Sequence, residues 1–273
     1  MKNAAITVSH NDGENLIKLI NAIRNYDCLD YIIVVDNKSD ELPDLTGLIE
    51  SQEKLILIPA EKNGGYGYGN NIGLKKAAEL GCEKAIICNP DTEWSEDTAN
   101  ALFETLENDV AVCSCICKAP ESSYEAPKSG WAIRPWHLEL FEHGPVSRRL
   151  WRGAISKADK EISAVHGSLL AVDIAKVLDA GGYDDNVFLY CEENILGYKI
   201  KQRGYRTVLR NDCSYFHNHK PAAPSVKNVK ILKDSLIYYF ERYLCLSPFD
   251  LCFAKLFMDF VVLETKLHSK SHQ

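Results

Sequence analysis

The sequence lacks long apolar runs, internal repeats and an excess of basic residues. No uncharged apolar stretch in its 273 residues approaches the roughly 20 residues that a membrane-spanning helix needs. There are 31 Lys and Arg against 38 Asp and Glu, which gives a formal net charge of −7. General nucleic-acid binding needs a basic surface, so this balance argues against that class of protein.

The ten cysteines lack the spacing of a metal-binding or disulfide motif, because no C-x-x-C pair occurs. Cys113, Cys115 and Cys117 alternate, so on a strand they would share one face and behave as small apolar residues. Scattered thiols are typical of a reducing compartment. Met1-Lys2-Asn3 leads directly into an apolar run. We therefore expect a cytoplasmic protein without a signal peptide, and the inner face of a membrane stays open as its location.

Two phosphate-binding motifs are also absent. The glycine-rich segment 63–73 lacks the Gly-Lys-Ser/Thr ending of a Walker P-loop, and it follows the third apolar segment. A dinucleotide fingerprint would follow the first. The first apolar segment ends instead at Ser9-His10-Asn11-Asp12, without the glycine-rich basic signature expected of nucleotidyltransferases acting on sugar phosphates.

Apolar segments alternate with stretches of helical periodicity in the first half of the chain. This rhythm predicts an α/β fold with a mixed, mainly parallel sheet flanked by helices. Strands are expected at 4–8, 31–35, 55–58, 84–88, 110–117 and 205–209. The alternation is lost over about 119–160, and order resumes at 164–172. We expect a helix over about 70–80 that ends at Gly81, and a helical extension from about residue 226.

Four polar clusters follow these apolar segments, at 9–12, 36–40, 63–71 and 89–92. The carboxyl ends of parallel strands meet at one edge of a sheet, where open α/β folds bind their ligands. The last cluster is Asn89-Pro90-Asp91-Thr92, which would place one carboxylate where a divalent cation and a diphosphate could meet. Taken alone, it is also ordinary turn chemistry.

The order of the motifs resembles the family 2 glycosyltransferases, most closely their rhamnosyltransferase-like and capsular-polysaccharide branch. The resemblance covers about residues 4–220. The motifs are Ser9-His10-Asn11, Val35-Asp36-Asn37-Lys38-Ser39, the segment from Asn63 to Gly73, Asn89-Pro90-Asp91-Thr92 and Tyr190-Cys191-Glu192-Glu193. The resemblance implies a GT-A fold, a nucleotide-sugar donor, a divalent Mn²⁺ or Mg²⁺ ion and inversion at the anomeric carbon.

The resemblance also implies a division of the chain. We expect a catalytic domain over 1–222, with a nucleotide-sugar-binding half at 1–118 and an acceptor-side half at 119–222. The extension 223–273 carries many apolar residues among a few charges. Packing on the catalytic domain, self-association as a homo-oligomer and peripheral membrane contact all remain open for it.

Carried over by position, the resemblance implies roles in donor and metal binding. Asp36 would read the nucleobase, and Ser9 and Asn11 would line the nucleotide. Asp91 falls on the family's Asp-x-Asp motif, whose first acid is Asn89 here, and would be the metal carboxylate. The remaining donor and metal residues are Asn63, Gly69, Asn70 and Asn89 for the donor, and His217 or His219 for the metal.

Glu192-Glu193 matches the family's Glu-Asp pair, whose second member is the usual base. This implies Glu193, with Glu192 as the alternative. The reaction needs such a group, because the acceptor hydroxyl loses a proton as it attacks. The metal offsets the negative charge that gathers on the leaving nucleoside diphosphate. The other interpretation is that both carboxylates only favour a helix N-terminus through its dipole.

Trp131 and His166 are expected on the acceptor side, where a flat aromatic ring would pack against a sugar. The expected reaction moves a hexose or deoxyhexose from a UDP- or dTDP-linked donor to a hydroxyl of a glycan, glycolipid or glycoprotein. Bacterial polysaccharide or glycoprotein glycan assembly is the expected setting. A nucleotidyltransferase on sugar phosphates and a non-catalytic nucleotide-sugar-binding partner stay open as alternatives.

Overall fold

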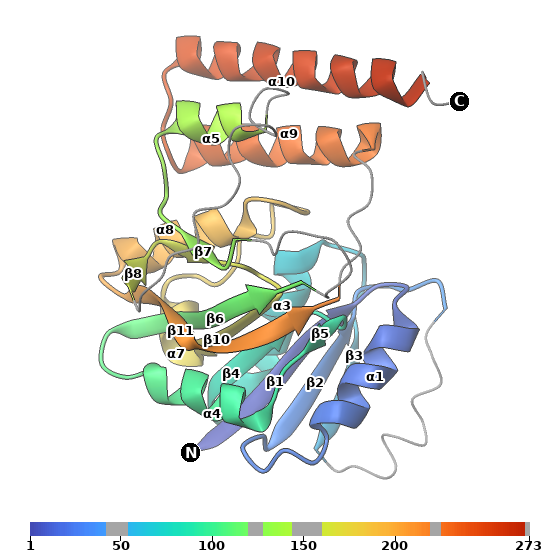
Figure 1. The fold of residues 1–273 in the computed structure, drawn as a ribbon, viewed down its shortest axis with the longest axis vertical. Helices are drawn as coiled ribbons and strands as arrows, with labels where there is room; N and C mark the ends of the chain where they lie inside the picture. The colour runs from blue at the N-terminus through green and yellow to red at the C-terminus, as the bar shows by residue number, and fades with distance from the viewer. Residues whose placement is uncertain (42–53, 120–127, 144–159, 219–224, 271–273) are drawn as a thin grey trace.

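The computed structural model describes residues 1–41, 54–119, 128–143, 160–218 and 225–270 (Figure 1). The strands are β1 (Lys2–Ser9), β2 (Tyr31–Asp36), β3 (Leu55–Pro59), β4 (Cys82–Cys88), β5 (Thr92–Glu93), β6 (Val110–Lys118), β7 (Gly130–Trp131), β8 (Lys160–Ile162), β9 (Ala164–Val165), β10 (Leu169–Asp173) and β11 (Arg206–His217). The helices are α1 (Gly13–Ile23), α3 (Tyr66–Glu79), α4 (Glu96–Thr105), α5 (Trp136–Glu142), α7 (Ile174–Asp179), α8 (Glu192–Gln202), α9 (Val226–Arg242) and α10 (Pro248–Lys270).

The strands form a mixed sheet in the order β3-β2-β1-β4-β10-β6-β11-β5, with β8 also paired to β11. Strands β1 to β4 pair in parallel, as do β6 and β11. Strand β10 is antiparallel to both β4 and β6, so these two run in the same direction. The expected α/β fold is confirmed. The carboxyl ends of β1, β2, β4, β6 and β11 therefore share one edge, where β10 begins.

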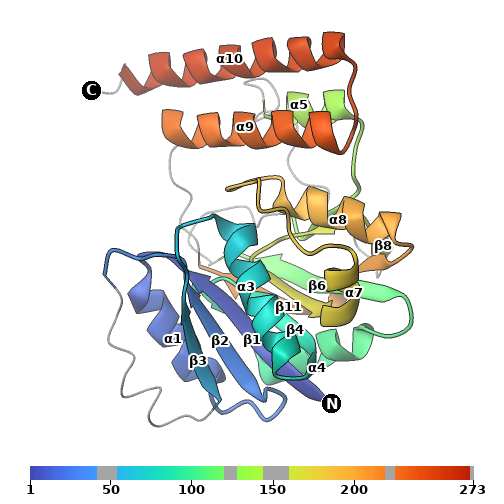
Figure 2. The same ribbon diagram turned by 180° about the vertical axis from the view of Figure 1, so that it is seen from behind.

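Helices cover both faces of the sheet (Figures 1 and 2). One core contains the inward side chains of α1 and α4, and the other contains those of α3, α7 and α8. Adjacent strand residues divide between the cores: Ala5 belongs to the first and Ile6 to the second. Cys113, Cys115 and Cys117 all lie in the first core, as their alternation predicts.

Helix α3 begins at Tyr66, four residues earlier than expected, within the glycine-rich segment 63–73. Its glycines allow the helix to lie against β1. A Cβ atom on Gly69 would stand 2.6 Å from Val8 Cγ1, and one on Gly73 would stand 2.3 Å from Ile6 Cγ2. Both distances are too short for real carbon atoms. The glycines here therefore serve close packing of a helix rather than the conformation of a loop.

The C-terminal helices α9 and α10, together with α5, form a layer beside the sheet domain (Figures 1 and 2). Leu236, Phe240 and Met258 in this layer share one core with Cys191 and Ile195 of the α8 region. The Ser235 hydroxyl donates to Leu189 O at 2.6 Å. Tyr238 and Tyr243 both donate to the carboxylate of Asp184, Tyr238 at 2.9 Å. Helix α9 thus holds the segment that leads into α8.

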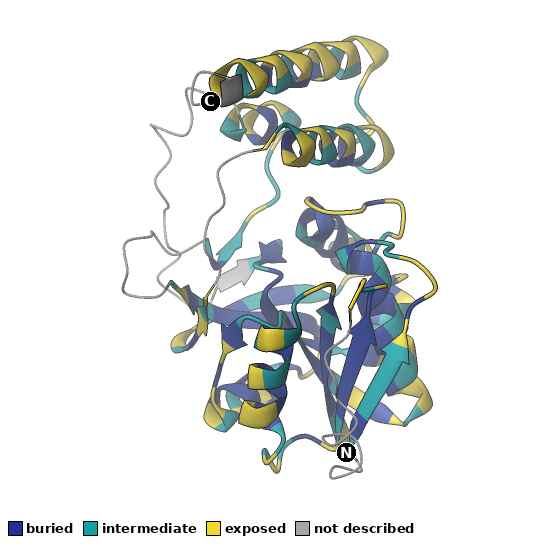
Figure 3. Ribbon diagram, turned by 90° about the vertical axis from the view of Figure 1, so that its right-hand side faces the viewer, coloured by how far each residue is buried: buried dark blue, intermediate teal, exposed yellow. Residues whose placement is uncertain are grey.

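Much of the α10 surface is exposed (Figure 3). Its exposed residues include a stripe of large apolar side chains. The stripe comprises Phe249, Phe253, Leu256, Phe260, Leu263 and Leu267. Steps of four and three residues are the spacing of a coiled-coil seam. Self-association and membrane contact both stay predictions, and this stripe is the surface where either would occur. Within the described residues, none of the helices combines the length and apolarity that crossing a membrane requires.

Substituting Gly73→Ala should lower the free energy of unfolding. The new methyl group meets the stiff, fully buried side chain of Ile6, and overpacking of this kind costs about 1–3 kcal/mol. That exceeds the gain of about 1 kcal/mol in helix propensity. Urea unfolding of the variant measures the difference.

The double variant Gly73→Ala/Ile6→Ala provides the control, because Ile6→Ala removes the obstructing methyl group. Its loss of stability should be smaller than the sum of the two single losses. Strict additivity, or a Gly73→Ala variant as stable as the parent, would contradict the packing described here.

Candidate functional site

The loops after β1 and β2 are joined by side-chain hydrogen bonds. Asn11 N donates to Ser39 Oγ at 2.9 Å, and Asn11 Nδ2 donates to Asp40 Oδ2 at 3.0 Å. Asp40 N returns a bond to Asn11 Oδ1 at 2.8 Å. Asn11 and Lys38 have φ values of 57° and 63°, a left-handed conformation that asparagine tolerates better than most residues. Ser9 is buried at the end of β1, and its carbonyl accepts from Asn37 N at 2.8 Å.

Asp36 and Asn63 sit on either side of Asn37. Asp36 is 4% exposed, and its Oδ1 accepts from Ser39 N at 3.0 Å. Asn37 Nδ2 donates to Asn63 Oδ1 at 3.1 Å and to Gly65 O at 2.9 Å. Asn37 therefore ties the end of β2 to the glycine-rich segment. Sequence reasoning did not single out Asn37, and its position next to Asp36 in the 35–39 motif was the available signal.

Gly69 and Asn70 lie inside α3, both buried. Asn70 is 0% exposed, and its Nδ2 donates to Tyr66 O at 3.1 Å. Gly65, just before the helix, has φ +91°, and a Cβ atom there would stand 2.0 Å from Phe188 O. Tyr66 N donates to that same carbonyl at 3.1 Å. The glycine-rich segment is thereby packed directly against the chain that leads into α8.

The Asn89-Pro90-Asp91 turn is held at both ends. Asn89 N donates to Ser168 O at 2.8 Å, and Asn218 N donates to Asp91 O at 2.8 Å. The Asp91 carboxylate Oδ1 lies 3.2 Å from His217 Nε2. The expected pairing of Asp91 with a histidine at the end of β11 is therefore present for His217. His219 lies outside the described residues.

The turn 166–168 lies between β9 and β10, at the centre of this edge. His166 Nδ1 is 2.8 Å from Ser168 Oγ, which is in turn 2.8 Å from the Tyr215 hydroxyl. The ring centroids of His166 and His217 are 5.5 Å apart. The expected acceptor residue His166 thus stands beside the expected metal residue His217.

Cys117 lies close to both of these histidines. One ligand atom from each of Cys117, His166 and His217 lies within 4.8 Å of the others. Burial raises the pKa of the Cys117 thiol, while hydrogen bonds from Tyr215 and Ser168 act in the opposite direction. The alternation of the cysteines predicted an apolar role for Cys117, and no feature of the sequence indicated its histidine neighbours.

The two glutamates begin α8 after a strained turn. Tyr190 and Cys191 have φ values of 72° and 65°, a left-handed conformation that costs non-glycine residues energy and tends to occur at functional sites. Glu193 Oε1 accepts from Gly167 N at 3.2 Å. A Cβ atom on Gly167 would stand 2.7 Å from that oxygen. Residue 167 thus leaves room for the Glu193 carboxylate beside the 166–168 turn.

The environment of the glutamate pair favours the neutral acids. Burial raises the pKa of Glu192, and the charge of Glu193 adds to this effect. Burial also raises the pKa of Glu193, while its backbone hydrogen bonds, including the one from Gly167, act in the opposite direction. A carboxylate with a raised pKa is a stronger base than an ordinary glutamate, as general base catalysis near neutral pH requires.

Trp131 lies next to the helix that carries the glutamates. Its indole Nε1 donates to Asn194 Oδ1 at 2.6 Å, and Asn194 Nδ2 donates to Glu139 Oε1 at 2.8 Å. Trp131 belongs to β7, which pairs with β9 immediately before the 166–168 turn. Trp131 and His166, far apart in sequence, are therefore on adjoining parts of the structure.

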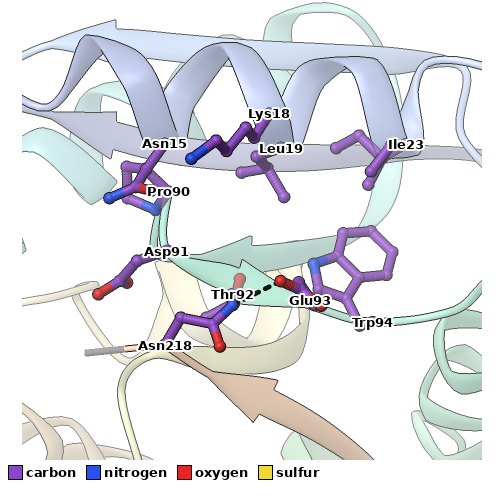
Figure 4. Close-up of a pocket in the computed structure, with 11 residues that line it drawn as sticks. Asn15, Lys18, Leu19, Ile23, Pro90, Asp91, Thr92, Glu93, Trp94 and Asn218 are labelled. Atoms are coloured by element: carbon purple, nitrogen blue, oxygen red, sulfur yellow. Dashed lines mark hydrogen bonds between the residues drawn. The ribbon is translucent and has the colours of Figure 1, made fainter. Parts of the chain in front are cut away.

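A cavity of about 610 Å³ opens between α1 and the residues after β4 (Figure 4). Asn15, Lys18 and Leu19 of α1 line one side, and the segment 90–94 lines the other. Asn218 Nδ2 donates to Glu93 Oε1 at 2.6 Å across its lower wall. Asp91 lines both this cavity and the strand edge with His217.

The donor atoms at the strand edge suit a divalent ion. A carboxylate and imidazole nitrogens are ligands for Mn²⁺, Co²⁺ and Zn²⁺ alike. The Asp91–His217 pair lies beside the 166–168 turn through the His166 ring, and Glu193 contacts the same turn through Gly167 N. The edge can therefore hold a cation and a base next to one short segment.

Comparison with known proteins gives relatives of one kind. Polypeptide N-acetylgalactosaminyltransferase 3 of Drosophila melanogaster is 25% identical over 232 residues, which are 78% of this chain and 34% of the relative. N-acetylglucosaminyl-diphospho-decaprenol L-rhamnosyltransferase of Mycobacterium tuberculosis is 22% identical over 206 residues, 68% of this chain and 66% of the relative. The chain thus spans about a third of the first relative and 66% of the second.

Among solved structures, GalNAc-T7 with UDP, GalNAc and Mn²⁺ has a TM-score of 0.64 and 18% identity, covering 96% of this chain and 54% of that one. This likeness establishes a shared GT-A fold. Residues 4–154, more than half of the chain, match the model of glycosyl transferase family 2. With the fold, the strand-end site and this match in agreement, the chain belongs to glycosyl transferase family 2.

Proposed function

We propose that the chain is a metal-dependent, inverting glycosyltransferase. It moves a hexose or deoxyhexose from a UDP- or dTDP-linked donor to a hydroxyl of a glycan, glycolipid or glycoprotein in bacterial glycan assembly. The observation that carries the proposal is the 166–168 turn, which contacts Glu193 through Gly167 N and lies beside His217 through the His166 ring. A base and a cation site meet there.

Donor binding is proposed at the ends of β1, β2 and β4. Ser9, Asn11 and Asp36 belong to loops that hydrogen-bond one another, and Asn63 is tied to the same loops through Asn37. Asn89 and Asp91 lie at the end of β4, where the diphosphate would sit. Gly69 and Asn70 would support the donor site from behind, because both are buried in α3.

A divalent ion would be held by Asp91 and His217, where it would neutralise the leaving nucleoside diphosphate. The proposed role of Glu193 is to accept the proton of the attacking hydroxyl. Its carboxylate is oriented by Gly167 N, and partial burial raises its pKa. Attack from the side opposite the diphosphate would invert the anomeric carbon.

Acceptor binding is proposed beside α8. Trp131 offers an indole ring anchored to Asn194, the residue after Glu193. Tyr190, two residues before Glu192, is 39% exposed, and His166 borders the same region. Aromatic faces of this kind pack against the apolar faces of sugars. The acceptor hydroxyl would then approach Glu193 from the β7 side.

Substituting Glu193→Gln should lower the rate of transfer by about 10²–10⁴-fold, because the amide cannot accept the proton. Donor affinity should change little, because the amide keeps the size of the carboxylate and its oxygen can still accept from Gly167 N. Release of nucleoside diphosphate from a panel of UDP- and dTDP-sugars measures the rate, and calorimetry measures donor binding. If Glu192→Gln causes the loss instead, Glu192 is the base. Full activity in both variants would sink the mechanism.

On the acid side, the rate of transfer should begin to fall at a pH above the pKa of an ordinary glutamate, which is about 4.3. Transfer needs the ionised base, and burial raises the pKa of both glutamates, so protonation begins at higher pH. Below the raised pKa, each pH unit should cost about tenfold in kcat.

The Glu192→Gln variant tests the cause of this limb. Burial raises the pKa of Glu193, and the charge of Glu192 is not a cause of that shift, so the acid limb of the kcat profile should stay in place in this variant. A limb that moves to lower pH would show that the charge of Glu192 also acts on the base.

A further inference from the structure

We propose that the strand edge binds its cation through the thiolate of Cys117 and the imidazoles of His166 and His217, and that it therefore selects an ion such as Zn²⁺ or Co²⁺ over Mg²⁺. The inference rests on the proposed function only in that it names the ion for the same site.

The three side chains come from three separate parts of the fold. Cys117 lies at the end of β6, His166 precedes β10, and His217 ends β11. Strand pairing brings them together, because Cys117 is the direct neighbour of Tyr215, two residues before His217. Their ligand atoms lie within 4.8 Å of one another. Atoms around one tetrahedral zinc ion stand roughly 3.5 Å apart, so a small inward adjustment completes the site.

His166 is held in place by Ser168. Its Nδ1 accepts from Ser168 N at 3.2 Å and lies 2.8 Å from Ser168 Oγ. Because a backbone N–H can only donate, Nδ1 is unprotonated, as a nitrogen that binds a metal ion must be. Ser168 Oγ is itself placed by the Tyr215 hydroxyl at 2.8 Å. The outer support of the ligand is therefore built into the sheet.

Cys117 completes the group of three, and Asp91 contacts it from outside. Cys117 is 1% exposed, and Tyr215 and Ser168 are in hydrogen-bond contact with its thiol, so hydroxyl groups already face the sulfur. Asp91 lies outside the group of three, and its Oδ1, 3.2 Å from His217 Nε2, can orient that imidazole. Sulfur and nitrogen donors suit zinc and cobalt, whereas magnesium prefers oxygen ligands in an octahedron.

Cobalt binding to the full chain, without donor or acceptor, tests the proposal. The chain is stripped with a chelator and titrated with Co²⁺, and the thiolate-to-cobalt charge-transfer absorption is followed. We expect this absorption in the parent chain and in Cys115→Ser, and its loss in Cys117→Ser. Cys115 is the matched control, because it lies on the same strand face and outside the group of three.

Two further measurements keep the test decisive. His166→Asn should weaken Zn²⁺ binding by at least tenfold while leaving the sulfur-to-cobalt absorption visible. X-ray absorption at the zinc edge of the parent chain should show one sulfur scatterer, which decides the matter even if Cys117→Ser does not fold. A sulfur-free zinc environment, or a cobalt spectrum that Cys117→Ser leaves unchanged, overturns the proposal.

Failure of this inference can be told apart from failure of the proposed function. If the chain transfers sugar with Mn²⁺ or Mg²⁺ and Cys117→Ser transfers equally well, the inference is wrong and the function stands. If cobalt and zinc bind through Cys117 but no donor is turned over, the ion site stands and the transferase proposal fails.

Discussion

The hydrogen bonds of the 166–168 turn are the constraint on which the candidate site depends. The Gly167 N–H holds the Glu193 carboxylate, and the Gly167 carbonyl accepts from the Tyr66 hydroxyl. The Ser168 carbonyl accepts from Asn89 N. One turn therefore positions α8, the start of α3 and the end of β4 together. Because residue 167 has no side chain, the carboxylate can approach the backbone directly.

The C-terminal helices also constrain the site, through their contacts with the segment that precedes α8. The strained conformations of Tyr190 and Cys191 need outside support, since each costs energy that the local chain does not recover. Helix α9 provides it through Ser235, which donates to Leu189 O, and through contacts of its core with Cys191. The helical layer is thus connected to the glutamate pair by a short path, and its packing bears on the geometry of α8.

Much of the architecture could be predicted from hydrophobic patterning. Buried parallel strands read as continuous apolar runs, and Tyr31–Asp36 and Cys82–Cys88 lie where such runs predict them. The predicted start of α3, at about residue 70, was wrong by four residues, because the helix begins at Tyr66. Glycine usually signals a loop, and only contact with Val8 and Ile6 explains glycines in a packed helix. The extension of β11 to His217 likewise depends on its partners β5, β6 and β8.

The sequence by itself determined the family, the order of the strand-end clusters and the pair Glu192-Glu193, because these are encoded in short local motifs. Tertiary structure decided which of those residues meet. The pairing of β11 with β5 and β6 places His217 beside Asp91 and near Cys117. The 166–168 turn adds His166 to that group, and its Gly167 N–H contacts the Glu193 carboxylate. Such contacts join residues 26 to 126 positions apart, and local periodicity carries no information about contacts at that separation.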